Sequence, residues 1–334
     1  MLLKDYLNGH TKEQLLDYAR DFELKNCSGL RKAALVERIM EYFCSEEILR
    51  SRIVCLTEEE MNIFRRACDA PQNISEKEIF AAMQLFLYQL GGFEETSDCF
   101  TIYEEIANIF KRIDDEAFRA EQSKKGWLMK CVHFFITYYG MAPLEVMYEL
   151  YRLKAEDTID DMIAMLNEMP LDIVESGIFT MEGLGLEDWT KNHPVYSDRG
   201  VLVHIPLLED EEIVYLLSQQ RDKQFYIPSA KQIDEIYVLG YEADSPAYKK
   251  LEAFFVEKMG IPHEEAASWC FQICVDNYKG ESPVNVINKM SEEGIMLKNQ
   301  EQAREIIELL VNAHNSTRMK ENRGHAPDEI AISA

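Results

Sequence analysis

The chain has 334 residues, of which 47% are hydrophobic, and its 35 Lys and Arg against 60 Asp and Glu give a net charge of −25. This length predicts several folded domains, and the charge argues against nucleic-acid binding over most of the surface, because acidic side chains repel phosphate. The chain has no apolar run of about 18 residues and begins with the charged segment MLLKDYLNGHTKEQ, so we expect a cytoplasmic protein with no membrane partner.

The charge is unevenly distributed along the chain. Residues 1–50 contain eight Lys and Arg against nine Asp and Glu, a net charge of −1, which leaves −24 for residues 51–334. Because phosphate contacts require Lys and Arg that are not outweighed by acids, we expect any nucleic-acid site within the first fifty residues.

Residues 1–52 predict a small helical unit. Thr11 is a suitable N-cap for a first helix over residues 12–22, where apolar residues recur with helical spacing. The linker ELKNCSG follows, and LRKAALVERIMEYF at residues 30–43 predicts the second helix. A unit of this size needs a neighbouring segment to support its core.

The two helices and their linker contain a T-K-x-x-L-x-x-x-A motif and an L-R-K-x-x-L-x-x-x-I motif. The residues concerned are Thr11, Lys12, Leu15, Ala19, Leu24, Lys25, Leu30, Arg31, Lys32, Leu35 and Ile39. Over residues 1–45 this pattern resembles the SAP domain and the related N-terminal domain of the transcription terminator Rho. The resemblance implies that the linker and the start of the second helix contact the DNA backbone or groove. By position it implies the nucleic-acid-binding residues Lys12, Lys25, Ser28, Arg31 and Lys32.

The next two segments, residues 53–122 and 123–208, each predict helices followed by two strands, which is a winged-helix-like order. A winged helix often places its third helix in the DNA major groove. Residues 143–215, however, carry seventeen acidic and four basic residues. Because such a surface repels phosphate, we expect both segments to dock proteins and not DNA.

Residues 209–334 predict a C-terminal helical domain with a long last helix over residues 299–325. A polar segment at its end, NAHNSTRMKENRGHAPDEI, contains a possible ligand or partner site. The candidate residues are Arg318, Asn322, Arg323 and His325. In a second, structural interpretation the arginine at position 318 bridges to acids of a neighbouring helix, and NRGH is a glycine C-cap.

The C-terminal region also resembles a group of uncharacterised bacterial proteins, many of which begin with a SAP-like unit. Some members of this group end in a SEC-C zinc motif. The present sequence contains no such cysteine cluster, so the resemblance implies no zinc site here.

No motif in the sequence predicts catalysis. The chain lacks the G-x-x-x-x-G-K-[ST], G-x-G-x-x-G, H-E-x-x-H and G-x-S-x-G motifs. Its eight cysteines are expected to be reduced, and the nearest pair, Cys270 and Cys274, is more typical of a buried helix face than of a metal site. We therefore expect no enzyme activity, no metal and no cofactor.

Together these features predict a mainly α, multidomain protein with a non-enzymatic role. The SAP-like unit would bind DNA through residues 1–45, and the acidic winged-helix-like and helical domains would bind protein partners. The alternative is a pure protein–protein interaction adaptor that does not bind nucleic acid.

Overall fold

The computed structural model describes residues 1–94, 99–187, 199–209 and 212–333. It confirms a mainly helical protein, with 65% of the residues in 18 helices and two small antiparallel sheets in the described ranges. No helix in these ranges is both long and apolar enough to cross a membrane.

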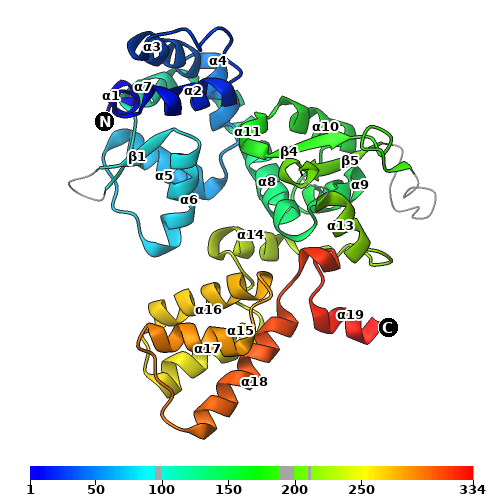
Figure 1. Cartoon of the computed structure of the whole chain (residues 1–334). Helices are drawn as coiled ribbons and strands as arrows, with labels where there is room; N and C mark the ends of the chain where they lie inside the picture. Colours follow the sequence, from blue (N-terminus) through cyan, green and yellow to red (C-terminus); the bar gives the residue numbers. More distant parts are fainter. Residues whose placement is uncertain (95–98, 188–198, 210–211, 334) are drawn as a thin grey trace. The chain divides into compact units, whose positions relative to one another are not determined.

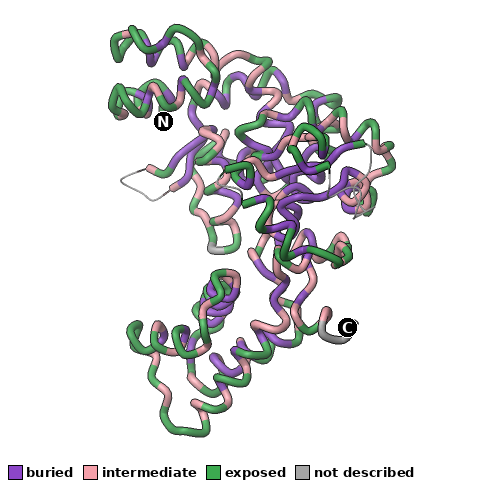
Figure 2. The backbone as a smooth tube through the Cα atoms, turned by 45° about the vertical axis from the view of Figure 1, so that its right-hand side comes forward, coloured by how far each residue is buried: buried purple, intermediate pink, exposed green. Residues whose placement is uncertain are grey.

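The chain divides into two compact units, which are described separately below (Figure 1). The first unit comprises Met1–Val132 and Lys154–Gly177, and the second comprises His133–Leu153 and Ile178–Ala334. Helix α8 (Glu116–Tyr138) continues from the first unit into the second. Buried and exposed residues alternate along the helices, as expected of amphipathic segments (Figure 2).

The first unit begins with four short helices. These are α1 (Leu3–Gly9), α2 (Lys12–Asp21), α3 (Lys32–Phe43) and α4 (Glu46–Ile53). The predicted N-cap of α2 is confirmed: the Thr11 hydroxyl accepts from the Gln14 amide, and the Gln14 side chain accepts from the Thr11 amide. Leu15 of α2 and Leu35 of α3 are fully buried where these two helices pack together.

The rest of the first unit supports these helices. The Leu3 amide donates to the Glu105 carboxylate at 2.9 Å, and α4 packs against α7 (Glu104–Ile113). The buried Arg52 guanidinium pairs with Asp172 at 2.8 Å and lies over the Phe43 ring. Residues 1–52 therefore share their core with later segments of the chain.

A helical segment with a hairpin follows in the same unit. Its elements are α5 (Glu58–Asp69), the short η1 (Glu76–Glu78), α6 (Ile79–Leu87), β1 (Gly91–Phe93) and β2 (Phe100–Ile102). The strands pair antiparallel with Gly91 opposite Ile102. A Cβ atom at Gly91 would lie 2.3 Å from the Thr101 carbonyl oxygen, so only glycine allows the two strands to approach this closely.

The expected order of three helices and two strands is present between residues 116 and 204. After α8, the elements are β3 (Met141–Pro143), α9 (Leu144–Tyr151), α10 (Ile159–Glu168), α11 (Leu171–Val174), β4 (Ser176–Phe179) and β5 (Val201–His204). The sheet order is β3-β5-β4, and β3 pairs antiparallel with β5. Strand β3 and the one-turn helix α11 are additions that the sequence pattern did not predict.

The rest of the second unit is helical. Its elements are η2 (Ile205–Leu208), α13 (Glu212–Gln219), α14 (Ala230–Leu239), α15 (Pro246–Ala253), the π-helical η3 (Phe254–Met259), α16 (His263–Tyr278), α17 (Pro283–Glu292), α18 (Gln300–Ser316), η4 (Lys320–Asn322) and α19 (Pro327–Ser333). Helix α18 packs against α15, α16 and α17, and Leu251, Phe255 and Ile306 lie in the core that these helices enclose.

The prediction of one helix over residues 299–325 is wrong. Helix α18 ends at Ser316, where Thr317 takes an extended backbone conformation. The Thr317 hydroxyl donates to the Ala313 carbonyl at 2.7 Å and contacts the Tyr248 hydroxyl at 2.8 Å. Asn, Ser and Thr side chains compete in this way with helical backbone hydrogen bonds, and several of them adjoin at this point.

Candidate nucleic-acid interface

The basic residues that the SAP resemblance selects are exposed near the start of α3. The Lys32 ammonium donates to the Asn8 carbonyl at the end of α1, at 2.7 Å. The Lys12 ammonium lies 3.5 Å from the Ser28 carbonyl oxygen, so the first turn of α2 meets the linker. Lys25 and Arg31 are also exposed, in the linker and at its end. The fold thus brings the linker and the starts of α2 and α3 to one region.

The linker is held by one buried side chain. Cys27 is buried, its carbonyl accepts from the Leu30 amide at 3.0 Å, and its thiol lies 3.7 Å from the Lys25 carbonyl oxygen. Asn26 adopts a left-handed backbone conformation with φ 64°, which asparagine tolerates better than most residues. This turn leaves Ser28 exposed beside the start of α3.

The charges of this region are not neutralised by carboxylates. Each of the other four cations in residues 1–50 forms an ion pair, whereas Lys12, Lys25, Arg31 and Lys32 have no carboxylate within 4 Å in the part of the chain that the structure describes. The ion pairs are Lys4–Glu37, Arg20–Asp17, Arg38–Glu41 and Arg50–Glu121. The four cations without an ion pair are the four basic residues that the sequence resemblance implies.

The N-terminus of α3 is open to an anion. Arg31 occupies the N-cap position without a side-chain hydrogen bond, and the first turn contains no acidic residue. In α2, by contrast, Thr11 caps the helix and Glu13 lies in the first turn. The amides of an uncapped first turn and the positive end of the helix dipole both favour a bound phosphate.

The C-terminal candidates form a buried clamp within the second unit. The Arg318 guanidinium, 8% exposed, pairs with Glu242 and Glu329, each at 2.9 Å, and lies 3.4 Å over the Tyr226 ring. Burial opposes ionisation of Glu329, but the hydrogen bond and charge of Arg318 outweigh it and hold the pKa of that carboxyl below its ordinary value. His325 also contacts the Glu329 carboxylate, at 3.2 Å.

The remaining candidates, Arg323 and Asn322, connect the C-terminal polar segment to residues 223–225. The Arg323 guanidinium donates to the Lys223 carbonyl at 2.6 Å, and its centre lies 4.5 Å from the Phe225 ring. The Lys223 ammonium in turn donates to the Asn322 side chain at 2.8 Å. Arg323 itself adopts a left-handed conformation with φ 52°. The geometry therefore favours the structural interpretation of this polar segment, which the clamp fastens to residues 223–226.

The cysteine pair lies in the core of the second unit. Cys270 and Cys274 are buried in α16, and burial raises the pKa of the Cys274 thiol to about 12. Among the described residues, no three His, Cys, Asp or Glu side chains are grouped as a metal site.

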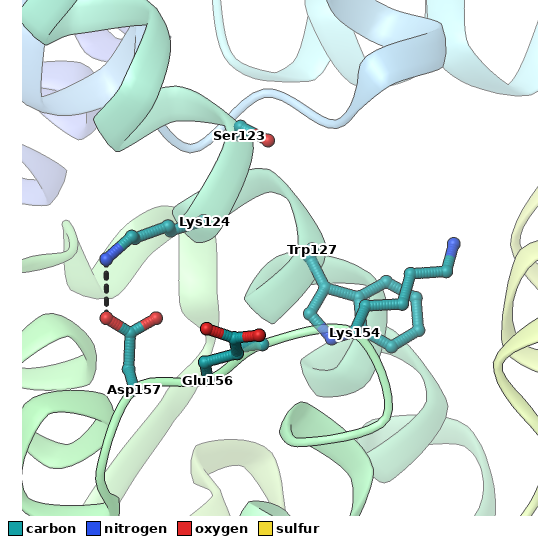
Figure 3. A pocket seen from close by; sticks show the side chains of 7 residues that line it. Ser123, Lys124, Trp127, Lys154, Glu156 and Asp157 are labelled. Atoms are coloured by element: carbon teal, nitrogen blue, oxygen red, sulfur yellow. Dashed lines mark hydrogen bonds and ion pairs between the residues drawn. The ribbon is translucent and has the colours of Figure 1, made fainter.

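A pocket that the sequence analysis missed lies on the first unit, between α8 and the loop that leads into α10. It has a volume of about 440 Å³, and Figure 3 shows the side chains that line it. They are Ser123, Lys124, Trp127, Lys154, Ala155, Glu156 and Asp157. No local motif could reveal it, because the rest of α8, strand β3 and helix α9 separate its two walls along the chain.

No protein-family model, no curated protein and no solved structure matches the chain. A function therefore has to be inferred from the residues and their geometry.

Proposed function

We propose that the chain is a non-enzymatic, DNA-associated protein that contacts duplex DNA through Lys12, Lys25, Arg31 and Lys32, with Ser28 beside them. The observation that carries the proposal is that these four are the Lys and Arg residues of the range 1–50 for which the described part of the chain provides no carboxylate partner. In a protein of net charge −25, most cations lie near acids that reduce their attraction for phosphate. Cations without a carboxylate partner keep that attraction.

The local fold supports this proposal. A capped helix, an exposed linker and a second helix without a side-chain cap follow one another here, and this order supports the proposal of a SAP-like unit. The open N-terminus of α3 adds backbone amides to the cations, and both groups bind phosphate without reading sequence. We infer a backbone-binding unit of modest affinity that tolerates different sequences.

The later segments support a protein-docking role. The element order and the β3-β5-β4 sheet are winged-helix-like, but α10, which would be the recognition helix, contains Asp160, Asp161 and Glu168 and no basic residue. Acidic side chains at this position repel the DNA backbone. DNA contact is thus assigned to residues 1–45 alone, and the acidic segments serve protein partners in the cytoplasm.

The first test is the salt dependence of DNA binding. Fluorescence anisotropy of a labelled duplex titrated with the full chain should show binding at micromolar concentrations in 50 mM salt. With four phosphate contacts the affinity should fall about 150-fold between 50 and 200 mM salt, because each contact contributes about 0.9 to the logarithmic slope. Absence of binding at tens of micromolar in 50 mM salt would refute the proposal.

A second function, that of a protein-interaction adaptor, is favoured by the exposed face of α6. Ile79, Met83 and Leu87 follow one another at four-residue spacing and are 49%, 39% and 61% exposed. Phe93 on the adjoining strand β1 is 39% exposed. An apolar stripe of this kind on a soluble protein is typical of an interaction surface.

The adaptor function predicts which surface retains a partner. A tagged full chain carrying Met83→Ser and Leu87→Ser should lose a protein that the wild type captures, because those side chains bury apolar area on binding. The Arg31→Ala, Lys32→Ala variant should retain it. Quantitative pull-down compares the two variants. If the Arg31→Ala, Lys32→Ala variant loses the captured protein and the Met83→Ser, Leu87→Ser variant retains it, the result would count against the adaptor function.

A further inference from the structure

The pocket between α8 and residues 154–157 has a preformed wall. The Lys124 ammonium on α8 pairs with the Asp157 carboxylate at 2.5 Å, which holds the loop against the helix (Figure 3). Directly after the loop, Thr158 and Asp161 form a capping box at the start of α10. The loop is therefore fixed at its C-terminal end, and its side chains keep a defined arrangement.

The floor of the pocket already binds a cation of the same chain. The Trp127 side chain is 8% exposed, and the Lys154 ammonium lies 4.4 Å from its ring centroid. This is a cation–π contact, for which tryptophan is the strongest aromatic partner. Since Lys154 is exposed, its ammonium remains hydrated and holds its place on the indole weakly.

A carboxylate is available beside this floor. Glu156 is exposed, lies between the Lys124–Asp157 pair and the Trp127–Lys154 pair in Figure 3, and forms no hydrogen bond or ion pair in the part of the chain described. The two lysines of the pocket are engaged with Asp157 and Trp127. Of the two carboxylates that line the pocket, Asp157 is paired with Lys124, so the Glu156 carboxylate is available to bind a positively charged ligand.

We propose that this pocket receives an arginine side chain of a protein partner. The guanidinium would replace Lys154 on the indole face and donate to the Glu156 carboxylate. Arginine suits both contacts, because its plane stacks on aromatic rings, its donors match a carboxylate, and it is less strongly hydrated than lysine. Residues 154–177, the part of the first unit that begins with the pocket loop, carry seven acids against one base, which attracts a basic partner and disfavours an anionic ligand. This site is independent of the proposed DNA contact.

The test uses N-acetyl-L-arginine N-methylamide as the probe and the citrulline analogue as its uncharged control. Binding to the full chain is followed by the indole N–H resonance of Trp127, assigned with a Trp127→Phe variant. We expect the arginine probe to shift this resonance saturably. Glu156→Gln should weaken binding about threefold by removing an exposed ion pair, and Lys154→Ala should strengthen it about threefold by removing the competing cation.

Glu13→Gln is the matched control, since it removes the same charge from an exposed position on α2. An equal response to the citrulline probe, or equal weakening by Glu13→Gln and Glu156→Gln, would show general electrostatic attraction and overturn the proposal. Unchanged or weaker binding to the Lys154→Ala variant would overturn the assignment of Lys154 as the competitor. The side chains of Glu13, Lys154 and Glu156 are exposed, so the fold is not at risk in the decisive variants.

Discussion

Replacing Arg31 and Lys32 together by alanine is expected to lower the affinity of the full chain for duplex DNA on the order of 50-fold in 0.1 M salt. Both side chains are exposed at the start of α3 and have no carboxylate partner among the described residues. Removing two phosphate contacts should also reduce the loss of affinity between 50 and 200 mM salt from about 150-fold to about 12-fold. Anisotropy titrations at several salt concentrations measure both quantities.

The chain offers a control of equal charge. Arg20→Ala with Arg38→Ala removes two cations from α2 and α3, but these are engaged with Asp17 and Glu41. That variant should retain both the affinity and the salt slope within a few fold, apart from the long-range effect of net charge. Equal losses in the two double variants would mean that net charge alone determines binding, and the assigned interface would be wrong.

Local sequence signals predicted the elements whose ends are set by neighbouring residues. Thr11 and Gln14 are three residues apart and form the capping box that begins α2. Gly140, with φ 69°, follows α8 in a left-handed conformation that glycine adopts without strain and that is typical of a helix end. In both cases the deciding interaction lies within about one helical turn.

Elements that depend on distant partners were not predictable in this way. Strand β3 has three residues, and its pairing places Met141 opposite Val203, about 60 residues later in the chain. Residues 327–333 form the short helix α19, which packs against α18. Short segments of this kind gain their structure from tertiary contacts, which outweigh local propensity.

For the same reason, the sequence predicted the basic residues of residues 1–45 but not the contacts of the clamp or the pocket. The basic residues of the first unit lie within 21 residues of one another, from Lys12 to Lys32, so a motif could select them. The clamp joins Arg318 to Glu242, and the pocket joins Trp127 to Lys154. Nothing in either local segment specifies its partner. A buried arginine was foreseeable only as one of two interpretations of the C-terminal polar segment.

The clamp should contribute strongly to the stability of the second unit. Besides Glu242 and Glu329, the Arg318 guanidinium donates to the Gly324 carbonyl at 3.1 Å. Gln232 extends the network by donating to the Tyr226 hydroxyl at 2.8 Å and to the Glu242 carboxylate at 2.6 Å. Removing one partner from such a network leaves the others desolvated and uncompensated, which costs more than the intact network contributes.

Arg318→Ala is therefore expected to lower the free energy of unfolding by about 3 kcal/mol, because the Glu242 carboxylate, only 14% exposed, is left without its cation. Arg318→Lys, which keeps the charge but loses the planar donors, should lose about half as much. Urea denaturation followed by circular dichroism measures the loss, and hydrogen exchange should show it as faster exchange at residues 223–226. Arg304→Ala, at an exposed position on the preceding helix α18, should change stability by less than about 0.5 kcal/mol. If Arg318→Ala is as stable as Arg304→Ala, the buried ion pairs do not hold these segments together, and the C-terminal polar residues would have to be reconsidered as a ligand site.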